Sequence, residues 1–153
     1  MKKLGETPFG SIRQIGILTE NLESFQEEYR RLYSLEPDKK SLVPVDAKED
    51  NCQRKLAFYQ FPEVEVEVIE PVRSKPEWHD FLRKYGGSIH HIQFNVDPLE
   101  DACKRLEAAG CRMIERGYSI NVPEVQYVFF DTVQRLGYVT ELVNFKEIER
   151  LKG

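Results

Sequence analysis

The chain has 153 residues, of which 41% are hydrophobic and 31% charged, so it can bury the core of one ordinary domain. This composition excludes a disordered chain, and no apolar run approaches the roughly 18 residues that a membrane span needs. The formal net charge of −4 comes from scattered charged residues, which makes nucleic acid a poor partner. No signal peptide is visible, and three cysteines without a CxxC pair fit reduced thiols, so we expect a cytoplasmic protein.

The first part of the chain, about residues 11–71, predicts one strand, one helix and three further strands. A strand passes through Gln14, and the helix follows from about Asn21 to Tyr33 because apolar residues recur there at helical spacing. The next strand is the least well defined, near Leu42–Val45, and it is followed by strands at Phe58–Phe61 and Val64–Ile69.

The sequence after residue 71 indicates a connecting segment and then a second set of the same elements, one strand, one helix and three strands. The connection, about residues 72–87, contains a short helix around Trp78–Tyr85. The second set, about residues 88–145, has its helix at about Pro98–Ala109, where Pro98 suits the first turn and Gly110 suits the position after the last. Its strands are expected after Ser88 and near Arg112–Ile114, Val125–Phe130 and Tyr138–Val143. The stretches 35–55 and 115–125 would be loops that shape a pocket.

The two sets are an internal repeat. Gln14 corresponds to His91 at an offset of 91 − 14 = 77, and Glu67 corresponds to Glu141 at an offset of 141 − 67 = 74. Loop variation accounts for the difference of three residues. We therefore predict an α+β fold in which two tandem βαβββ modules form an open eight-stranded cup within a single domain, residues 1–153.

Four polar residues at repeated positions are predicted to point away from the helices. Strand alternation places Gln14, Glu67, His91 and Glu141 on the helix-free face of their sheets. Alternating valine and glutamate is also the pattern of a sheet with one solvated face. The repeat favours a site instead, because the four positions are two symmetry-related pairs that a pseudo-twofold axis would bring together. Their donor groups, one imidazole, one amide oxygen and two carboxylates, also suit a divalent cation.

These patterns resemble a known superfamily. The paired modules, the stretch from Trp78 to Val96 with its Gly-x-x-His-His-Ile, and the segments Glu67–Pro71 and Leu136–Val143 resemble the vicinal oxygen chelate superfamily (glyoxalase, bleomycin resistance and dioxygenase proteins). The branch that includes methylmalonyl-CoA epimerase is the most similar. The resemblance implies metal ligands at Gln14, Glu67, His91 and Glu141. His91 rather than His90 is chosen because alternation places His90 on the helix side.

The same resemblance implies a reaction. We expect an isomerase, epimerase or lyase that abstracts a proton next to a carbonyl through a metal-stabilised enolate, with Glu141 or Glu67 as ligand and base. The metal would be a divalent ion such as Co, Ni, Mn, Zn or Mg, the substrate an acyl-CoA or hydroxycarbonyl compound, and the protein a homodimer. Two features depart from the family: most members have histidine at the position of Gln14, and the segment Cys52–Ala57 has no carboxylate where the epimerases place a second glutamate base.

Three alternatives remain open from the residues alone. The same cup in a resistance-type module would bind a small molecule without chemistry, with Phe58, Tyr59, Tyr127 and Phe129 as lining or as ordinary core aromatics. An iron-dependent extradiol dioxygenase is less expected because it usually needs two histidines and one carboxylate. A glutathione-dependent glyoxalase has no recognisable glutathione signature here.

Overall fold

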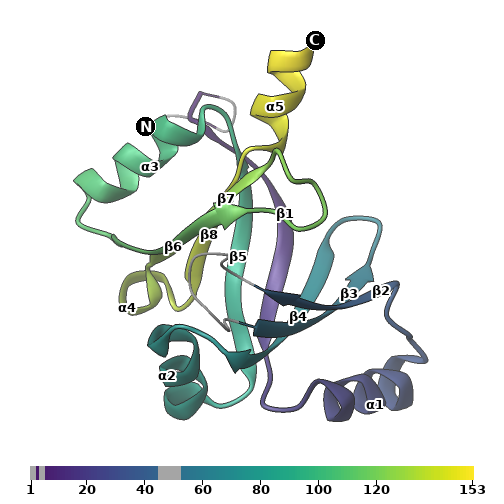
Figure 1. Cartoon of the computed structure of the whole chain (residues 1–153). Coiled ribbons are helices and arrows are strands. Elements are labelled where there is room, and N and C mark those ends of the chain that lie inside the picture. Colours follow the sequence, from purple (N-terminus) through teal and green to yellow (C-terminus); the bar gives the residue numbers. More distant parts are fainter. Residues whose placement is uncertain (1–2, 4–5, 45–52) are drawn as a thin grey trace. The chain divides into compact units, whose positions relative to one another are not determined.

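The computed structural model describes residues 3, 6–44 and 53–153, and these form eight strands and five helices (Figure 1). Val45 at the end of the expected second strand and Cys52 lie outside the described residues. Within this part of the chain, no helix is both long and apolar enough to cross a membrane. The elements in chain order are β1 (Phe9–Leu18), α1 (Leu22–Tyr33), β2 (Lys39–Pro44), β3 (Gln53–Gln60), β4 (Glu65–Arg73), α2 (Pro76–Tyr85), β5 (Ser88–Val96), α3 (Leu99–Ala108), β6 (Arg112–Tyr118), β7 (Gln126–Asp131), α4 (Val133–Leu136), β8 (Val139–Val143) and α5 (Phe145–Lys152).

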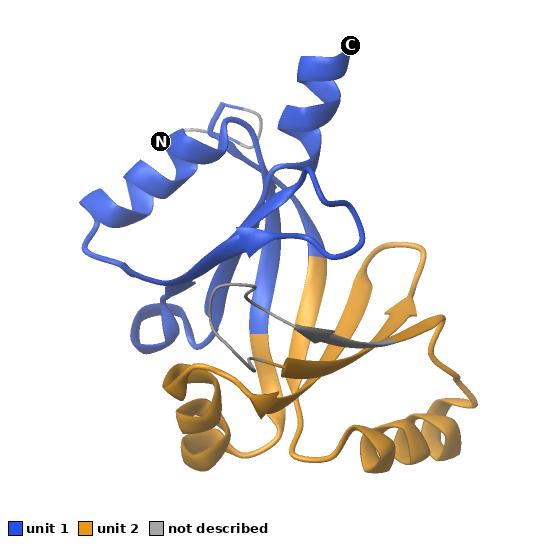
Figure 2. Cartoon of the chain, in the orientation of Figure 1, with its two compact units in different colours: residues 1–13, 91–153 blue, residues 14–90 orange. Residues whose placement is uncertain are grey.

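The chain divides into two compact units. Unit 1 comprises residues 1–13 and 91–153, and unit 2 comprises residues 14–90. Figure 2 shows the change of unit partway along β1 and again partway along β5, so each of these strands belongs to both. The strand order is β2-β3-β4-β1-β5-β8-β7-β6, as the repeat predicts for an eight-stranded sheet built from two βαβββ modules.

Unit 2 buries its apolar core between α1 and its strands. β1 runs parallel to β4, and β3 runs antiparallel to both β2 and β4. Val66 and Val68 of β4 face the helix, as alternation predicts, while Glu65 and Glu67, which alternate with them, face the other side. The buried members of this cluster are Leu22, Ala57, Tyr59, Val66 and Val68, with Ile17, Phe25, Tyr29, Leu35 and Phe61 packed against them.

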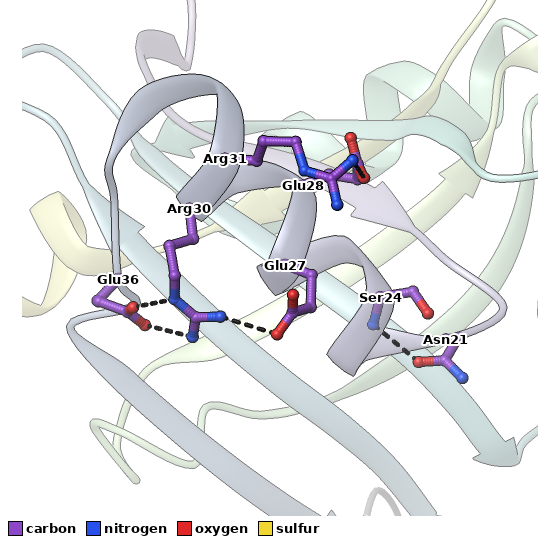
Figure 3. Close-up of polar contacts among 7 residues, drawn as sticks. All are labelled: Asn21, Ser24, Glu27, Glu28, Arg30, Arg31 and Glu36. Atoms are coloured by element: carbon purple, nitrogen blue, oxygen red, sulfur yellow. Dashed lines mark hydrogen bonds and ion pairs between the residues drawn. The ribbon is translucent and has the colours of Figure 1, made fainter.

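Local polar contacts fix both ends of α1 (Figure 3). At its start the Asn21 side chain accepts a hydrogen bond of 2.9 Å from the backbone N–H of Ser24, which satisfies one of the otherwise unpaired donors of the first turn. At its end Arg30 binds Glu36 through two nitrogens, at 2.5 and 3.2 Å, and Glu27 at 2.9 Å. Arg30 lowers the pKa of the Glu36 carboxyl by hydrogen bonding to its ionised form.

Unit 1 repeats this construction around α3. β5 runs parallel to β8, and β7 runs antiparallel to both β6 and β8. The start of β1 lies against the end of β5, where a side chain on Gly10 would approach the carbonyl oxygen of Asn95 to 2.9 Å. Arg150 of α5 holds Asp97 through two hydrogen bonds of 2.9 Å. The core cluster contains Val96, Leu99, Ala102, Cys103, Val128, Phe130 and Leu142.

Most predicted elements are present, with shifted ends. α1 and α3 begin one residue later than expected, and α2 begins two residues earlier, at Pro76, which suits a first helical turn. β3 begins at Gln53 and β6 extends to Tyr118, so parts of the two stretches expected as loops are strand instead. Gly110 follows α3 with a φ of 87°, the left-handed conformation predicted for it.

Candidate active site

His91 and Glu141 are brought together in unit 1 by the parallel pairing of β5 with β8. Gln93 lies in register with Glu141, two residues along the strand from His91. His91 is fully buried, and its Nε2 lies 3.8 Å from Oε2 of Glu141, which is also buried. The Nε2 of Gln93 donates a hydrogen bond to the other carboxylate oxygen, Oε1. One imidazole and one oriented carboxylate therefore share this point on the sheet.

Aromatic and cationic residues support this pair. The ring of Phe129 meets that of His91 edge-on, with centroids 5.1 Å apart. On the β1 side Arg13 donates a hydrogen bond of 3.3 Å to Oε1 of Gln93, and its guanidinium lies 3.8 Å from the ring centroid of Phe145. Because the amide oxygen of Gln93 accepts from Arg13, its NH₂ group is directed at Glu141. The carboxylate is thus positioned by a chain of side-chain contacts.

His90 has a different environment, as strand alternation predicts. Its ring lies between two side chains of α2, with centroid distances of 4.5 Å to Trp78 and 4.7 Å to Phe81. The Arg54 guanidinium lies 3.7 Å from the centroid of Trp78, and its Nε donates to the Ser74 hydroxyl at 3.1 Å. This arrangement gives His90 and Trp78 a packing role in unit 2.

In unit 2 the corresponding strands β1 and β4 carry the other two predicted residues. Gln14 is buried, and its Nε2 donates a hydrogen bond of 2.7 Å to Oε1 of Glu65, with which it is in register. Glu67 lies in register with Gly16 and, on its other side, with Phe58. Glu65, which was not among the four predicted residues, is thus the hydrogen-bond partner of Gln14. Strand alternation predicts that Glu65 and Glu67 lie on the same face. Only Glu67 was chosen as a candidate site residue, because it is the one that corresponds to Glu141 in the repeat.

The donor pair in unit 1 fits a divalent metal ion. The 3.8 Å between His91 Nε2 and Glu141 Oε2 is too long for a hydrogen bond, and two ligand atoms bonded to one cation at about 2.0–2.2 Å lie roughly 3–4 Å apart. Across the described residues, no group of three or more His, Cys, Asp and Glu side chains is placed to hold a metal. His91 and Glu141 are therefore the pair of donors in unit 1, while Gln14 and Glu67 belong to unit 2.

A second buried carboxylate, Glu115, lies in the same row of side chains. Glu115 on β6 is in register with Phe129 on β7, which is in register with Glu141 on β8. Glu115 is only 5% exposed, and one of its oxygens, Oε2, accepts a hydrogen bond of 3.0 Å from the Tyr127 hydroxyl. Sequence reasoning missed this residue because its strand was expected to end at Ile114.

The position of Glu115 depends on an irregularity in β6. Unbroken alternation would put Glu115 on the same side as Met113, which packs against the α3 cluster. The register between β6 and β7 shifts by one residue between Met113 and Glu115, so Met113 pairs with Phe130 and Glu115 with Phe129. This bulge turns Glu115 to the face that carries Glu141. No signal in the sequence marks it.

Comparison with known proteins identifies the class. A family model for the Glyoxalase/Bleomycin resistance protein/Dioxygenase superfamily matches residues 13–129. The chain therefore belongs to this superfamily, and its two βαβββ modules are those of the vicinal oxygen chelate fold.

Individual relatives are named as epimerases. The mitochondrial methylmalonyl-CoA epimerase of Dictyostelium discoideum is 26% identical over 140 residues, which cover 91% of this chain and 81% of that protein. The ethylmalonyl-CoA/methylmalonyl-CoA epimerase of Cereibacter sphaeroides is 27% identical over 109 residues, covering 71% of this chain and 77% of that protein. These relatives confirm the resemblance to the epimerase branch.

Solved structures share the fold. Methylmalonyl-CoA epimerase from Mycobacterium tuberculosis matches with a TM-score of 0.68 at 18% identity, over 93% of this chain and 92% of that one. A methylmalonyl-CoA epimerase in complex with methylmalonyl-CoA and NH₄⁺ matches with a TM-score of 0.66 at 22% identity, over 89% of this chain and 94% of that one. At these identities the likeness concerns the fold.

Proposed function

We propose that this protein is a metal-dependent epimerase that abstracts a proton next to the carbonyl of an acyl-CoA thioester. The observation that carries the proposal is the buried pair formed by His91 and Glu141, whose carboxylate is positioned by Gln93. The names of the relatives supply the substrate class: two of them are epimerases of methylmalonyl-CoA.

The proposed metal ligands are Gln14, Glu67, His91 and Glu141. When bound, a divalent cation acts as a Lewis acid that stabilises negative charge developing on the carbonyl oxygen. Gln14 supplies its amide oxygen as the ligand, since its NH₂ group is engaged by Glu65. The two carboxylates of the set match the charge of the dication.

Glu141 is the proposed base, with Glu67 as the alternative. The Glu141 carboxylate takes the proton from the carbon next to the thioester carbonyl, and the electron pair of that C–H bond moves into the enolate. Gln93 holds the carboxylate at one oxygen, so the other oxygen, Oε2, is the one that faces His91 and the reacting groups. Burial of Glu141 and His91 keeps bulk water from this proton transfer.

The first test is metal content, measured by plasma mass spectrometry on untagged protein before and after EDTA treatment and reconstitution. We expect about one equivalent of a divalent metal in the wild type and its loss in His91→Ala and Glu141→Ala. His90→Ala is the matched control, because the neighbouring histidine packs against α2, and it should retain the metal. If no metal binds under any reconstitution, the four residues are a polar lining and the protein is a small-molecule-binding module.

The second test follows the proton. Wild-type protein incubated with methylmalonyl-CoA in D₂O should incorporate deuterium at the carbon between the two carbonyl groups, as seen by NMR. Glu141→Gln should abolish this exchange, whereas Glu28→Gln, at an exposed residue of α1 paired with Arg31, should not change it. An unaltered exchange rate in Glu141→Gln would remove Glu141 from the role of base. The homodimer and cytoplasmic location expected from the sequence stay predictions.

A further inference from the structure

Epimerisation needs proton transfer on two faces of one carbon. The proton that leaves and the proton that returns approach the enolate from opposite sides, because the configuration inverts. A single carboxylate on one side of the carbon returns its proton to the side from which it came. The proposed function therefore requires a second proton-carrying group in addition to Glu141, and the segment Cys52–Ala57 offers no carboxylate for this role.

Unit 1 contains a carboxylate in a suitable place. Glu115 and Glu141 lie on the same face of the sheet with one strand between them, so their Cα atoms are roughly 10 Å apart at two strand spacings. The residue between them is Phe129, whose side chain provides an apolar surface. All three residues are buried in this row.

Glu115 is held in a defined orientation. The Tyr127 hydroxyl donates to its Oε2 at 3.0 Å, which orients the carboxyl group. Tyr127 is in turn fixed by its cross-strand neighbour Gly117, since a Cβ on Gly117 would lie 2.6 Å from the tyrosine oxygen and 2.8 Å from the attached ring carbon. Only glycine leaves space for this ring, and the ring then supports Glu115.

We propose that Glu115 is the second acid–base residue of the site, an inference that rests on the proposed function. In one direction the Glu141 carboxylate removes the proton and the enolate forms. Glu115, in its carboxylic acid form, then gives its proton to the opposite face, where the enolate electron pair becomes the new C–H bond. Glu115 is left as the carboxylate and Glu141 as the acid. The reverse reaction uses the same two groups in exchanged roles, and exchange with water resets them.

The test separates inversion from exchange in Glu115→Gln. Starting from one epimer of methylmalonyl-CoA in D₂O, the wild type should show both deuterium incorporation and epimerisation. Glu115→Gln should lose epimerisation by about 10²-fold or more. It should still incorporate deuterium into the epimer that presents its proton to Glu141, with retained configuration. Glu124→Gln, at an exposed residue paired with Lys152, is the matched control and should behave as wild type.

The other outcomes overturn the proposal in distinguishable ways. Epimerisation within a few-fold of wild type in Glu115→Gln would exclude Glu115 as the second group. Loss of both exchange and epimerisation, with metal content and circular dichroism unchanged, would also overturn it, because Glu115 would then act in every proton transfer. Absence of exchange in the wild type would instead overturn the proposed function, and the role of Glu115 with it. Tyr127→Phe, which keeps the ring, should lower epimerisation more than exchange, and Tyr118→Phe, at an exposed tyrosine, should change neither.

Discussion

The contact between Gly117 and Tyr127 gives a quantitative prediction for one added methyl group. Gly117 lies in β6 outside the left-handed region, so its backbone accepts alanine. At such a position Gly→Ala ordinarily stabilises a protein by about 0.4–1 kcal/mol, because it reduces the freedom of the unfolded chain. Here the new Cβ would lie 2.6, 2.8 and 3.1 Å from three atoms of the Tyr127 side chain. Ordinary contacts begin near 3.4 Å, so the tyrosine has to move.

The size of the effect follows from what that movement breaks. Displacing the ring removes the Tyr127–Glu115 hydrogen bond, and bonds to a charged group contribute about 1.5–3 kcal/mol. Forcing a side chain from its rotamer adds about 0.5–1.5 kcal/mol. After subtraction of the backbone gain, Gly117→Ala should lower the free energy of unfolding by about 2 kcal/mol.

A double-mutant cycle measured by urea denaturation tests the reasoning. Gly117→Ala, Tyr127→Ala and the double variant are compared with wild type, and the m-values are checked for a common unfolding transition. With the ring removed, the new methyl group meets no obstacle, so Gly117→Ala should be neutral or slightly stabilising in that background. The coupling should be about 2–3 kcal/mol. Equal destabilisation in both backgrounds, or no destabilisation in either, would refute the assignment of the clash to Tyr127.

Three further predictions concern the packing of each unit. Tyr59→Phe should raise the free energy of unfolding by about 1 kcal/mol, because its buried hydroxyl has no hydrogen-bond partner in the described part of the chain; a loss of stability in thermal unfolding would contradict this. Asn21→Ala should cost about 1 kcal/mol by removing the cap of α1, whereas Asn21→Asp should restore it, and equal stability of both variants would argue against the cap. Burial raises the pKa of the Cys103 thiol to about 11, so at pH 8 native Cys103 should react with iodoacetamide at least about 100-fold more slowly than in urea-unfolded protein, and faster as the pH rises toward 11. Equal labelling of native and unfolded protein, read by mass spectrometry, would show that the thiol is accessible.

Periodicity was sufficient to predict much of the fold and to bring His91 and Glu141 to the same face of the sheet. Apolar spacing located α1 and α3 to within one residue, because those helices pack one apolar side against a sheet. Strand alternation predicted that His90 and His91 point to opposite faces of the sheet. In the structure His90 packs against Trp78, whereas His91 lies near Glu141. The repeat offsets were also informative: Glu67 and Glu141 occupy equivalent register positions, opposite Gly16 and Gln93, each two residues beyond Gln14 or His91.

The residues that were missed depend on information that a linear pattern does not contain. Glu115 lies on the same face as Glu141 because of a bulge in β6. A one-residue shift in register moves each later side chain of the strand to the face opposite the one that alternation predicts. Gln93 and Glu65 were on the predicted face, but their partners depend on the register between strands far apart in the sequence. Arg13 acts through a side-chain contact with Gln93 that only three-dimensional packing defines.

Comparison of equivalent rows in the two units explains why Glu141 is a better candidate for the base than Glu67. In unit 1 the row runs Glu115, Phe129, Glu141, Gln93 from β6 to β5. The equivalent row of unit 2, from β2 to β1, is Lys39, Phe58, Glu67, Gly16.

The aromatic residue and the inner glutamate are retained in both rows, while the outer carboxylate and the amide that orients the inner one occur in unit 1 alone. The residue opposite Glu67 is a glycine, whereas Gln93, opposite Glu141, donates a hydrogen bond to its carboxylate. The groups proposed to transfer protons, Glu141 and Glu115, therefore both lie in unit 1. In unit 2 the equivalent positions carry Glu67 and, in place of the outer carboxylate, Lys39.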